Sequence, residues 1–120
     1  MLHDADKFYE SWPATMSAVK TANPDLGRAF APFFQTLMKE GALSVKQKEL
    51  IALAIGVATR CEPCIFAHTE KCIKNGATPA EVLEAAGVAL MMGGGPVYTY
   101  MPVVVAALKH FETVAAGSGG

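Results

Sequence analysis

Helix start and stop signals divide this sequence into short segments, and no other feature constrains its fold as much. Ser44 with Gln47 forms a capping box, in which each side chain bonds the backbone N–H of the other residue. The segment 78–81, Thr-Pro-Ala-Glu, is a second capping box with proline at the first helical position. Asn75-Gly76 is a stop signal just before it. No segment alternates at a period of two with β-branched residues, so the sequence predicts an all-α protein with about six helices.

We expect these helices over residues 4–21, 24–40, 45–59, 63–74, 79–92 and 97–115. Proline lies inside three of them, and we expect a break at Pro13, a kink or a split at Pro32 and a bend at Pro102. A length of 120 residues fits a single domain, 1–120, with a flexible tail at 116–120.

The run from Ala85 to Leu108 carries no formal charge and resembles a membrane span. The triplet Gly93-Gly94-Gly95, followed by Pro96, divides it into two halves, each too short to cross roughly 30 Å of hydrocarbon. The polar, acidic start of the chain has no features of a signal peptide. We therefore expect a cytoplasmic protein that does not enter the membrane.

The composition is apolar and nearly neutral. Lys and Arg number 10 against 11 for Asp and Glu, which gives no basic surface for nucleic acid or for an anionic membrane. Hydrophobic residues make up 52% of the chain and charged residues only 18%. A chain this short cannot bury so much apolar surface by itself. We therefore expect a homo-oligomer, either a trimer or a hexamer.

The stretch RCEPCIFAH holds the residues with the most chemistry. Cys61 lies at the boundary of the helix that Pro63 opens, and Cys64 lies in its first turn. Free backbone N–H groups and the helix dipole favour a thiolate there, and Arg60 adds a positive charge. His68 is one turn beyond Cys64 and can take its proton directly or through one water. Two thiols at this spacing can also close a disulfide, so one can attack and the other resolve.

Each of these residues also has a simpler interpretation. The two cysteines could be small core residues, His68 a satisfied core histidine, and Glu49 a solvated carboxylate in the first turn of its helix. A buried Glu49 would need a partner, for which His68 is the obvious candidate. Cys72 extends the pattern toward a zinc knuckle. On one continuous helix, however, Cys61 and Cys72 are about 16 Å apart, too far to share a metal, so we interpret Cys72 as a buried core thiol.

The set formed by Glu49, Cys61-Glu62-Pro63-Cys64 and His68, with eleven and three residues between its parts, resembles the signature of AhpD-like alkylhydroperoxidases. These proteins belong to the carboxymuconolactone decarboxylase superfamily. The resemblance covers residues 44–111 and is closest to the single-domain branch that contains the cysteine pair.

The resemblance implies a thiol peroxidase. Cys64 would be oxidised to a sulfenic acid by a small hydroperoxide, and Cys61 would resolve it as a disulfide. Glu49 and His68 would form the proton relay that activates the thiol. No bound cofactor is implied, and an unidentified external thiol would reduce the disulfide. Pro63 stands where the best-studied members have a histidine, which removes one possible member of the relay.

Two other functions remain open at this point. A lyase related to carboxymuconolactone decarboxylase would act on a lactone without using the cysteines, but members with that activity generally lack the cysteine pair. A non-enzymatic protein that binds thiols or a metal would contain zinc and lose stability with a chelator.

Overall fold

The computed structural model describes residues 4–119, with side chains as far as residue 113. In this part of the chain every regular element is a helix, which confirms the all-α prediction. Six helices are long, and a seventh is a single turn of four residues. The helices are α1 (Ala5–Ala22), α2 (Pro24–Met38), α3 (Val45–Ala58), α4 (Glu62–Lys74), α5 (Pro79–Gly93), α6 (Gly95–Tyr98) and α7 (Met101–Gly119).

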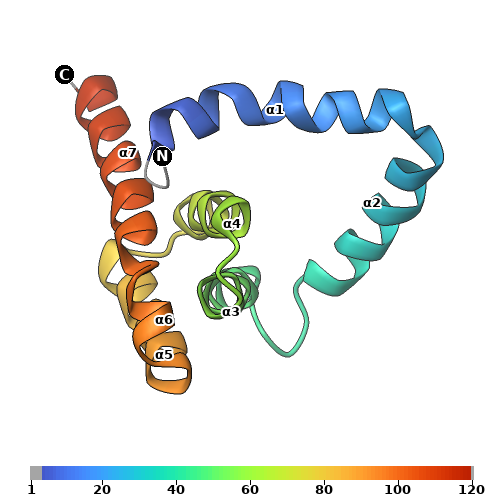
Figure 1. The fold of residues 1–120 in the computed structure, drawn as a ribbon. Helices are drawn as coiled ribbons and strands as arrows, with labels where there is room; N and C mark the ends of the chain where they lie inside the picture. The colour runs from blue at the N-terminus through green and yellow to red at the C-terminus, as the bar shows by residue number, and fades with distance from the viewer. Residues whose placement is uncertain (1–3, 120) are drawn as a thin grey trace.

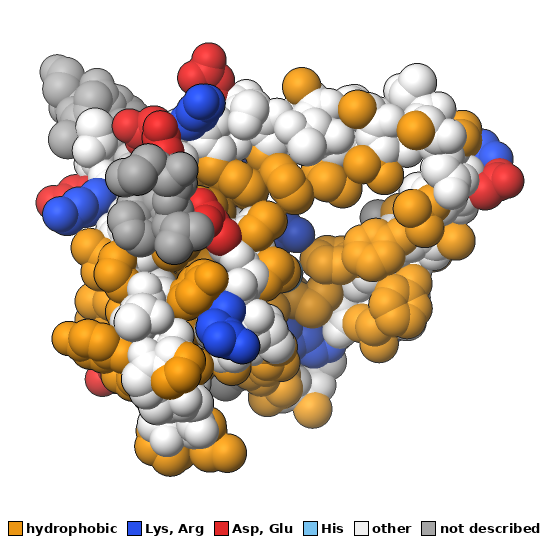
Figure 2. Space-filling model, in the orientation of Figure 1, with side chains coloured by type: hydrophobic (Ala, Val, Ile, Leu, Met, Phe, Trp, Pro, Cys, Tyr) orange, Lys and Arg blue, Asp and Glu red, His pale blue; other side chains and the backbone are white. Residues whose placement is uncertain are grey.

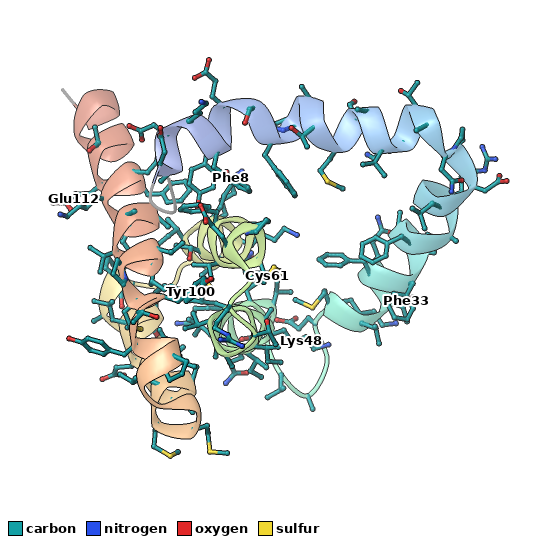
Figure 3. The ribbon with its side chains drawn as sticks, viewed as in Figure 1. Phe8, Phe33, Lys48, Cys61, Tyr100 and Glu112 are labelled. Atoms are coloured by element: carbon teal, nitrogen blue, oxygen red, sulfur yellow. A yellow bond between two sulfur atoms is a disulfide. The ribbon has the colours of Figure 1, made fainter. Side chains whose placement is uncertain are left out.

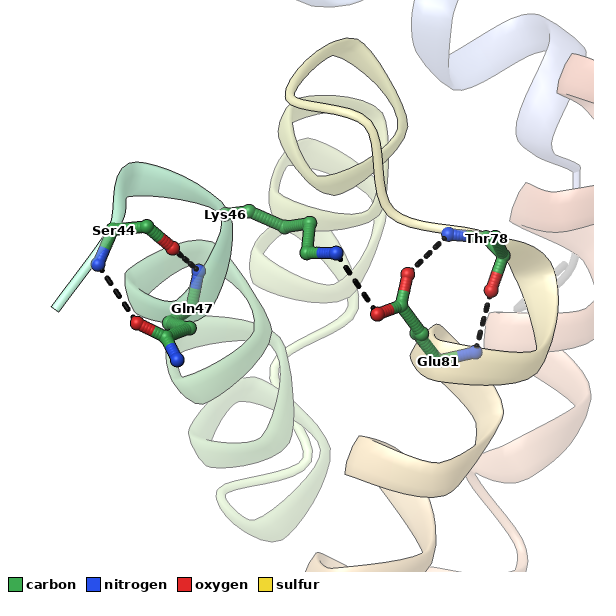
Figure 4. Close-up of polar contacts among 5 residues, drawn as sticks. All are labelled: Ser44, Lys46, Gln47, Thr78 and Glu81. Carbon is green, nitrogen blue, oxygen red and sulfur yellow. Dashed lines mark hydrogen bonds and ion pairs between the residues drawn. The ribbon is translucent and has the colours of Figure 1, made fainter.

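Both expected capping boxes are present, at the starts of α3 and α5 (Figure 4). Ser44 Oγ accepts from the Gln47 N–H at 3.0 Å, and Gln47 Oε1 accepts from the Ser44 N–H at 2.8 Å. In the second box Thr78 Oγ1 accepts from the Glu81 N–H at 3.1 Å, and Glu81 Oε1 accepts from the Thr78 N–H at 2.9 Å. Lys46 Nζ also donates to Glu81 Oε2 at 2.9 Å, so the second box ties α3 to α5. The Thr78 N–H, and then Lys46, lower the pKa of the Glu81 carboxyl.

The body of the molecule is built around the pair α3 and α4 (Figure 1). Helix α3 packs on α4 and α5, and α4 packs on α7. Fully buried side chains from all four helices form the core: Leu53, Val57, Ile65, Phe66, Cys72, Val82, Val103 and Val104. Helices α3 and α4 therefore lie at the centre of the body, and the turn that joins them is at its surface.

The start of α1 is anchored on this body by aromatic side chains. Phe8 and Tyr9 pack against the buried ring of Phe66, with ring centroids 4.8 and 5.7 Å away. The Tyr9 hydroxyl also donates to the backbone carbonyl of Phe66 in α4. The first turns of α1 are therefore fixed to the helix that carries the cysteine pair.

The rest of α1 and all of α2 project away from the body. We call residues 13–38 the arm; none of its residues is buried, and only Gly27, Phe34 and Met38 are half-buried. Figure 1 shows the arm curving around α3 and α4, and Figure 2 shows an opening between the arm and the body. The radius of gyration is 14.8 Å, against roughly 13–14 Å for a compact chain of this length. The arm accounts for this extended shape.

The proline positions differ from expectation. The predicted break at Pro13 is wrong, because α1 continues through it, and Pro32 does not split α2. A proline removes one helical hydrogen bond but keeps a helical φ, and on the exposed arm water can bond the freed carbonyl. The expected final helix is in fact divided into α6 and α7. Pro102 lies at the second position of α7, where its missing N–H has no helical partner to lose.

Two further expectations concern the end of the chain and the uncharged run from Ala85 to Leu108. Helix α7 is assigned as far as Gly119, beyond the expected end at Ala115. The flexible tail predicted at 116–120 lies outside the residues with described side chains. Within the described part of the chain, no helix combines the length and the apolar character that crossing a membrane requires.

Candidate active site

Cys61 lies in the turn between α3 and α4. It takes part both in the end of α3 and in the start of α4. The Arg60 N–H donates to the Val57 carbonyl at 3.0 Å, and the Cys61 N–H donates to the Gly56 carbonyl at 2.9 Å. These two bonds form a Schellman motif that ends α3. Arg60 occupies the position that glycine usually takes, with φ 57°. A side chain in this left-handed region costs roughly 1–2 kcal/mol, so the turn before the cysteine pair is held under strain.

Cys61 is also the N-cap of α4. Its sulfur accepts from the Cys64 N–H at 3.3 Å, as a serine oxygen would in an ordinary N-cap. The two cysteines are joined by a disulfide, with their Cα atoms 5.2 Å apart. Figure 3 shows Cys61 where α3 and α4 meet, on the side turned toward the arm. Pro63 is exposed in the first turn, where α4 needs no N–H from it.

Glu49 and His68 are in contact across the interface of α3 and α4. His68 Nδ1 lies 2.7 Å from Glu49 Oε1. The Glu49 residue is only 3% exposed, and the His68 side chain is 19% exposed. When Nδ1 donates this bond to the Glu49 carboxylate, the lone pair of a neutral imidazole lies on Nε2. The contact that the sequence could only suggest is therefore present.

The four candidate residues converge on the first two turns of α4. Cys64 and His68 are one turn apart on one face, at about 5–6 Å between Cβ atoms for such a pair. Glu49 reaches this face from α3. On reduction of the disulfide, this arrangement would place a thiol at a helix start, one turn from a histidine that is bonded to a buried carboxylate.

Cys72 is one further turn along α4 and is fully buried. This agrees with its interpretation as a core thiol. Burial, and then the negative charge of Glu49, raise the pKa of the Cys72 thiol to about 12. In the described part of the chain no three His, Cys, Asp or Glu side chains are grouped to hold a metal ion. Cys72 therefore belongs to the core beneath the site.

The raised pKa of Cys72 should make the stability of the oxidised protein depend on pH. An unfolded chain ionises this thiol above about pH 9, whereas the folded chain keeps its proton up to about pH 12. The free energy of unfolding should therefore fall as the pH rises through this window, by about 1.4 kcal/mol per unit at most. From pH 8 to pH 10.5, urea unfolding of the wild type should lose about 2 kcal/mol more than that of Cys72→Ala. Equal losses in the two proteins would contradict the assignment.

The larger surface grooves on the described residues include two that lie away from the cysteine pair. One of about 850 Å³ is bordered by α5, α6 and α7, and an apolar one of about 500 Å³ lies on the arm. Neither is lined by a candidate residue. Sequence reasoning missed Gly56, which touches both cysteines, and also the strained backbone of Arg60. No pattern in the sequence marks Gly56. For Arg60, the only available signal is its position just after the end of a predicted helix, where a left-handed residue is common.

Comparison with known proteins shows the family to which the chain belongs. The model of the carboxymuconolactone decarboxylase family matches residues 24–109, which include the arm's second helix and all four candidate residues. The chain belongs to the carboxymuconolactone decarboxylase family. An uncharacterized protein of Cupriavidus necator is 31% identical over 99 residues, covering 82% of this chain and 85% of its own.

Solved structures from the family have the same fold. A carboxymuconolactone decarboxylase family protein from Legionella pneumophila superposes with a TM-score of 0.80 at 35% identity, covering 92% of this chain and 96% of its own. A family protein from Thermotoga maritima, for which a role in the antioxidative response has been suggested, superposes with a TM-score of 0.71 at 30% identity. That match covers 76% of this chain and 94% of the other. Family membership and the helical fold are thus established together.

Proposed function

We propose that this protein reduces small organic hydroperoxides with the Cys61–Cys64 pair, using Cys64 as the attacking thiol and Cys61 as the resolving thiol. The observation that carries the proposal is the disulfide at the start of α4, one turn from a histidine paired with a buried carboxylate. Membership of the family, and the antioxidative role suggested for the Thermotoga maritima protein, support the same chemistry.

The first step breaks the O–O bond of the substrate. His68 Nε2 takes the proton of the Cys64 thiol, directly or through one water, while Glu49 stabilises the imidazolium. The Cys64 thiolate attacks the terminal oxygen of the hydroperoxide. A sulfenic acid forms on Cys64, and the alkoxide leaves with the proton from His68 as an alcohol. The sulfur is oxidised by two electrons and the peroxide is reduced by two.

The second step forms the disulfide. The Cys61 sulfur attacks the sulfenic sulfur of Cys64, and the hydroxyl leaves with the Cys61 proton as water. The disulfide at Cys61 and Cys64 is the product expected of this step. An external dithiol then reduces it by exchange and is itself oxidised to a disulfide. A reducing compartment such as the cytoplasm would supply that dithiol.

A single-turnover experiment tests the function itself. Reduced protein, freed of reductant, is mixed with excess cumene hydroperoxide, and the alcohol product and the free thiols are counted. We expect one alcohol formed and two thiols lost per chain, followed by repeated turnover when dithiothreitol is supplied. No consumption of hydroperoxide would refute the proposal. A lactone substrate converted equally well after both cysteines are replaced would favour the lyase instead.

We also propose that the arm is the surface through which copies of this chain assemble into a trimer or a hexamer. The arm exposes a series of apolar side chains that its own body does not cover: Met16, Val19, Leu26, Phe30, Phe33 and Leu37. Helix α2 has 15 residues and none of them is buried. A helix of this length is marginal in water unless an apolar face is packed. Contact with another copy would supply that packing.

Light scattering of Phe33→Asp should show the loss of this assembly. Phe33 is 61% exposed, so a charge there should leave the fold of one chain intact. We expect the wild type at three or six times the chain mass of 12.6 kDa and the variant at a lower multiple. Phe33→Leu keeps the apolar contact and should keep the assembly. A wild type that is monomeric at micromolar concentration would contradict this proposal.

A further inference from the structure

Gly56 lies near the end of α3, where this helix meets the start of α4, and it is buried. A Cβ atom added to it would lie 3.0 Å from Cys64 Cβ and 3.5 Å from both the Cys64 carbonyl carbon and the Ile65 nitrogen. The first of these distances is tighter than ordinary carbon–carbon contact. The absence of a side chain at this position therefore allows the first turn of α4 to approach α3 closely.

Gly56 also bonds the other cysteine of the pair. Its carbonyl accepts the Cys61 N–H at 2.9 Å, in the Schellman motif that ends α3. One residue of α3 thus bonds Cys61 through its backbone oxygen and leaves room for Cys64 because it has no side chain. Together the two features bring both cysteines close to the helix that also carries Glu49.

We propose that Gly56 is the positioning residue of the cysteine pair: it holds Cys61 and Cys64 in the geometry that allows their disulfide to form and break without a change in the turn. The catalytic consequence rests on the peroxidase function proposed above, whereas the effect on the disulfide itself does not. Gly56 touches no substrate and acts only through the two cysteines.

Another helical glycine offers a matched comparison. Alanine is favoured over glycine within a helix, so an added methyl group should stabilise either helix unless it meets a neighbour. Gly87 lies in α5, and a Cβ atom added there would meet nothing within 4 Å. Alanine at Gly87 should therefore affect only the helix propensity, whereas alanine at Gly56 adds the same atom against Cys64.

The test is the equilibrium between the protein disulfide and dithiothreitol, which becomes a cyclic disulfide as the protein becomes a dithiol. Disulfides tolerate little displacement of their Cα and Cβ atoms. In Gly56→Ala the Cys64 backbone must move by a few tenths of an ångström, so the disulfide should become easier to reduce. We expect the equilibrium constant for reduction to rise about tenfold, and to stay within twofold of wild type in Gly87→Ala. An unchanged constant in folded Gly56→Ala would overturn the inference.

A measurement on the wild type covers the case in which Gly56→Ala does not fold. If Gly56 holds the turn, the Cys61 amide should resist hydrogen exchange in both the oxidised and the reduced protein. Loss of its protection on reduction would mean that the disulfide holds the turn, and the inference would fail. Because neither readout uses a hydroperoxide, a failure here is distinct from a failure of the proposed peroxidase. A shifted equilibrium with no peroxidase activity would keep the inference and remove the function.

Discussion

Replacing Cys64 by serine should lower the rate of hydroperoxide reduction by roughly 10³-fold or more, as removal of a nucleophile does in other enzymes. A serine hydroxyl is not ionised near neutral pH, and it cannot pass through a sulfenic acid to a disulfide. The fold should survive, because Cys64 is only partly buried and the N-cap of α4 is Cys61. Steady-state turnover of cumene hydroperoxide with dithiothreitol measures the effect.

The matched control is the third cysteine. Cys72→Ala removes a thiol from the same face of the same helix, but from a fully buried position. Its turnover should remain near that of the wild type. Full activity in Cys64→Ser would show that another residue attacks the peroxide. A loss of activity in folded Cys72→Ala would show that the core thiol takes part in the reaction.

Glu49→Gln should lower the same rate by about 10²-fold, the lower end of what general acid–base catalysis contributes. Glutamine has nearly the shape of glutamate and can still accept the bond from His68 Nδ1, so the histidine keeps its place. It carries no charge, however, and no longer stabilises the imidazolium that forms when His68 takes the thiol proton. The pH dependence of thiol alkylation in the reduced protein should shift to higher pH, which a purely structural effect would not produce.

Glu70→Gln is the comparison for this variant. Glu70 lies on α4 near His68 in sequence, and its carboxylate pairs at 3.6 Å with Lys74 on the surface. Its replacement should leave both the rate and the alkylation profile unchanged. If Glu49→Gln and Glu70→Gln behaved alike, the contact between Glu49 and His68 would be structural only.

The helix boundaries that could be predicted are those with local causes. A capping box needs only residues three apart, and both boxes formed as expected. Proline was a less reliable guide, since its effect depends on whether the freed carbonyl meets water or protein. Pro13 lies on the exposed arm and did not break α1, whereas the division before Pro102 involves a turn that the sequence did not mark.

The candidate site was predictable to the extent that it lies within one helix. Cys61, Cys64 and His68 follow from their spacing on α4. The contact of Glu49 with His68 depends on how α3 packs against α4, over 19 positions of sequence, and became certain only in the structure. The role of Gly56 is a contact between helices with no pattern of its own.

The exposed position of the arm could not be predicted from the sequence, for a different reason. One chain alone leaves apolar side chains of the arm exposed. The sequence shows that such apolar side chains need to be covered. It does not show whether the same chain or another chain covers them. The apolar composition therefore predicted an assembly, but it did not predict that residues 13–38 would project from the body.

Intact mass after brief oxidation tests the central claim most directly. The reduced wild type and Cys61→Ser are each treated with cumene hydroperoxide and measured at once; serine at position 61 should still cap α4. We expect the wild type to lose two hydrogens, and the variant to gain one oxygen that maps to Cys64. Unchanged masses in both proteins would show that the cysteine pair does not react with hydroperoxides.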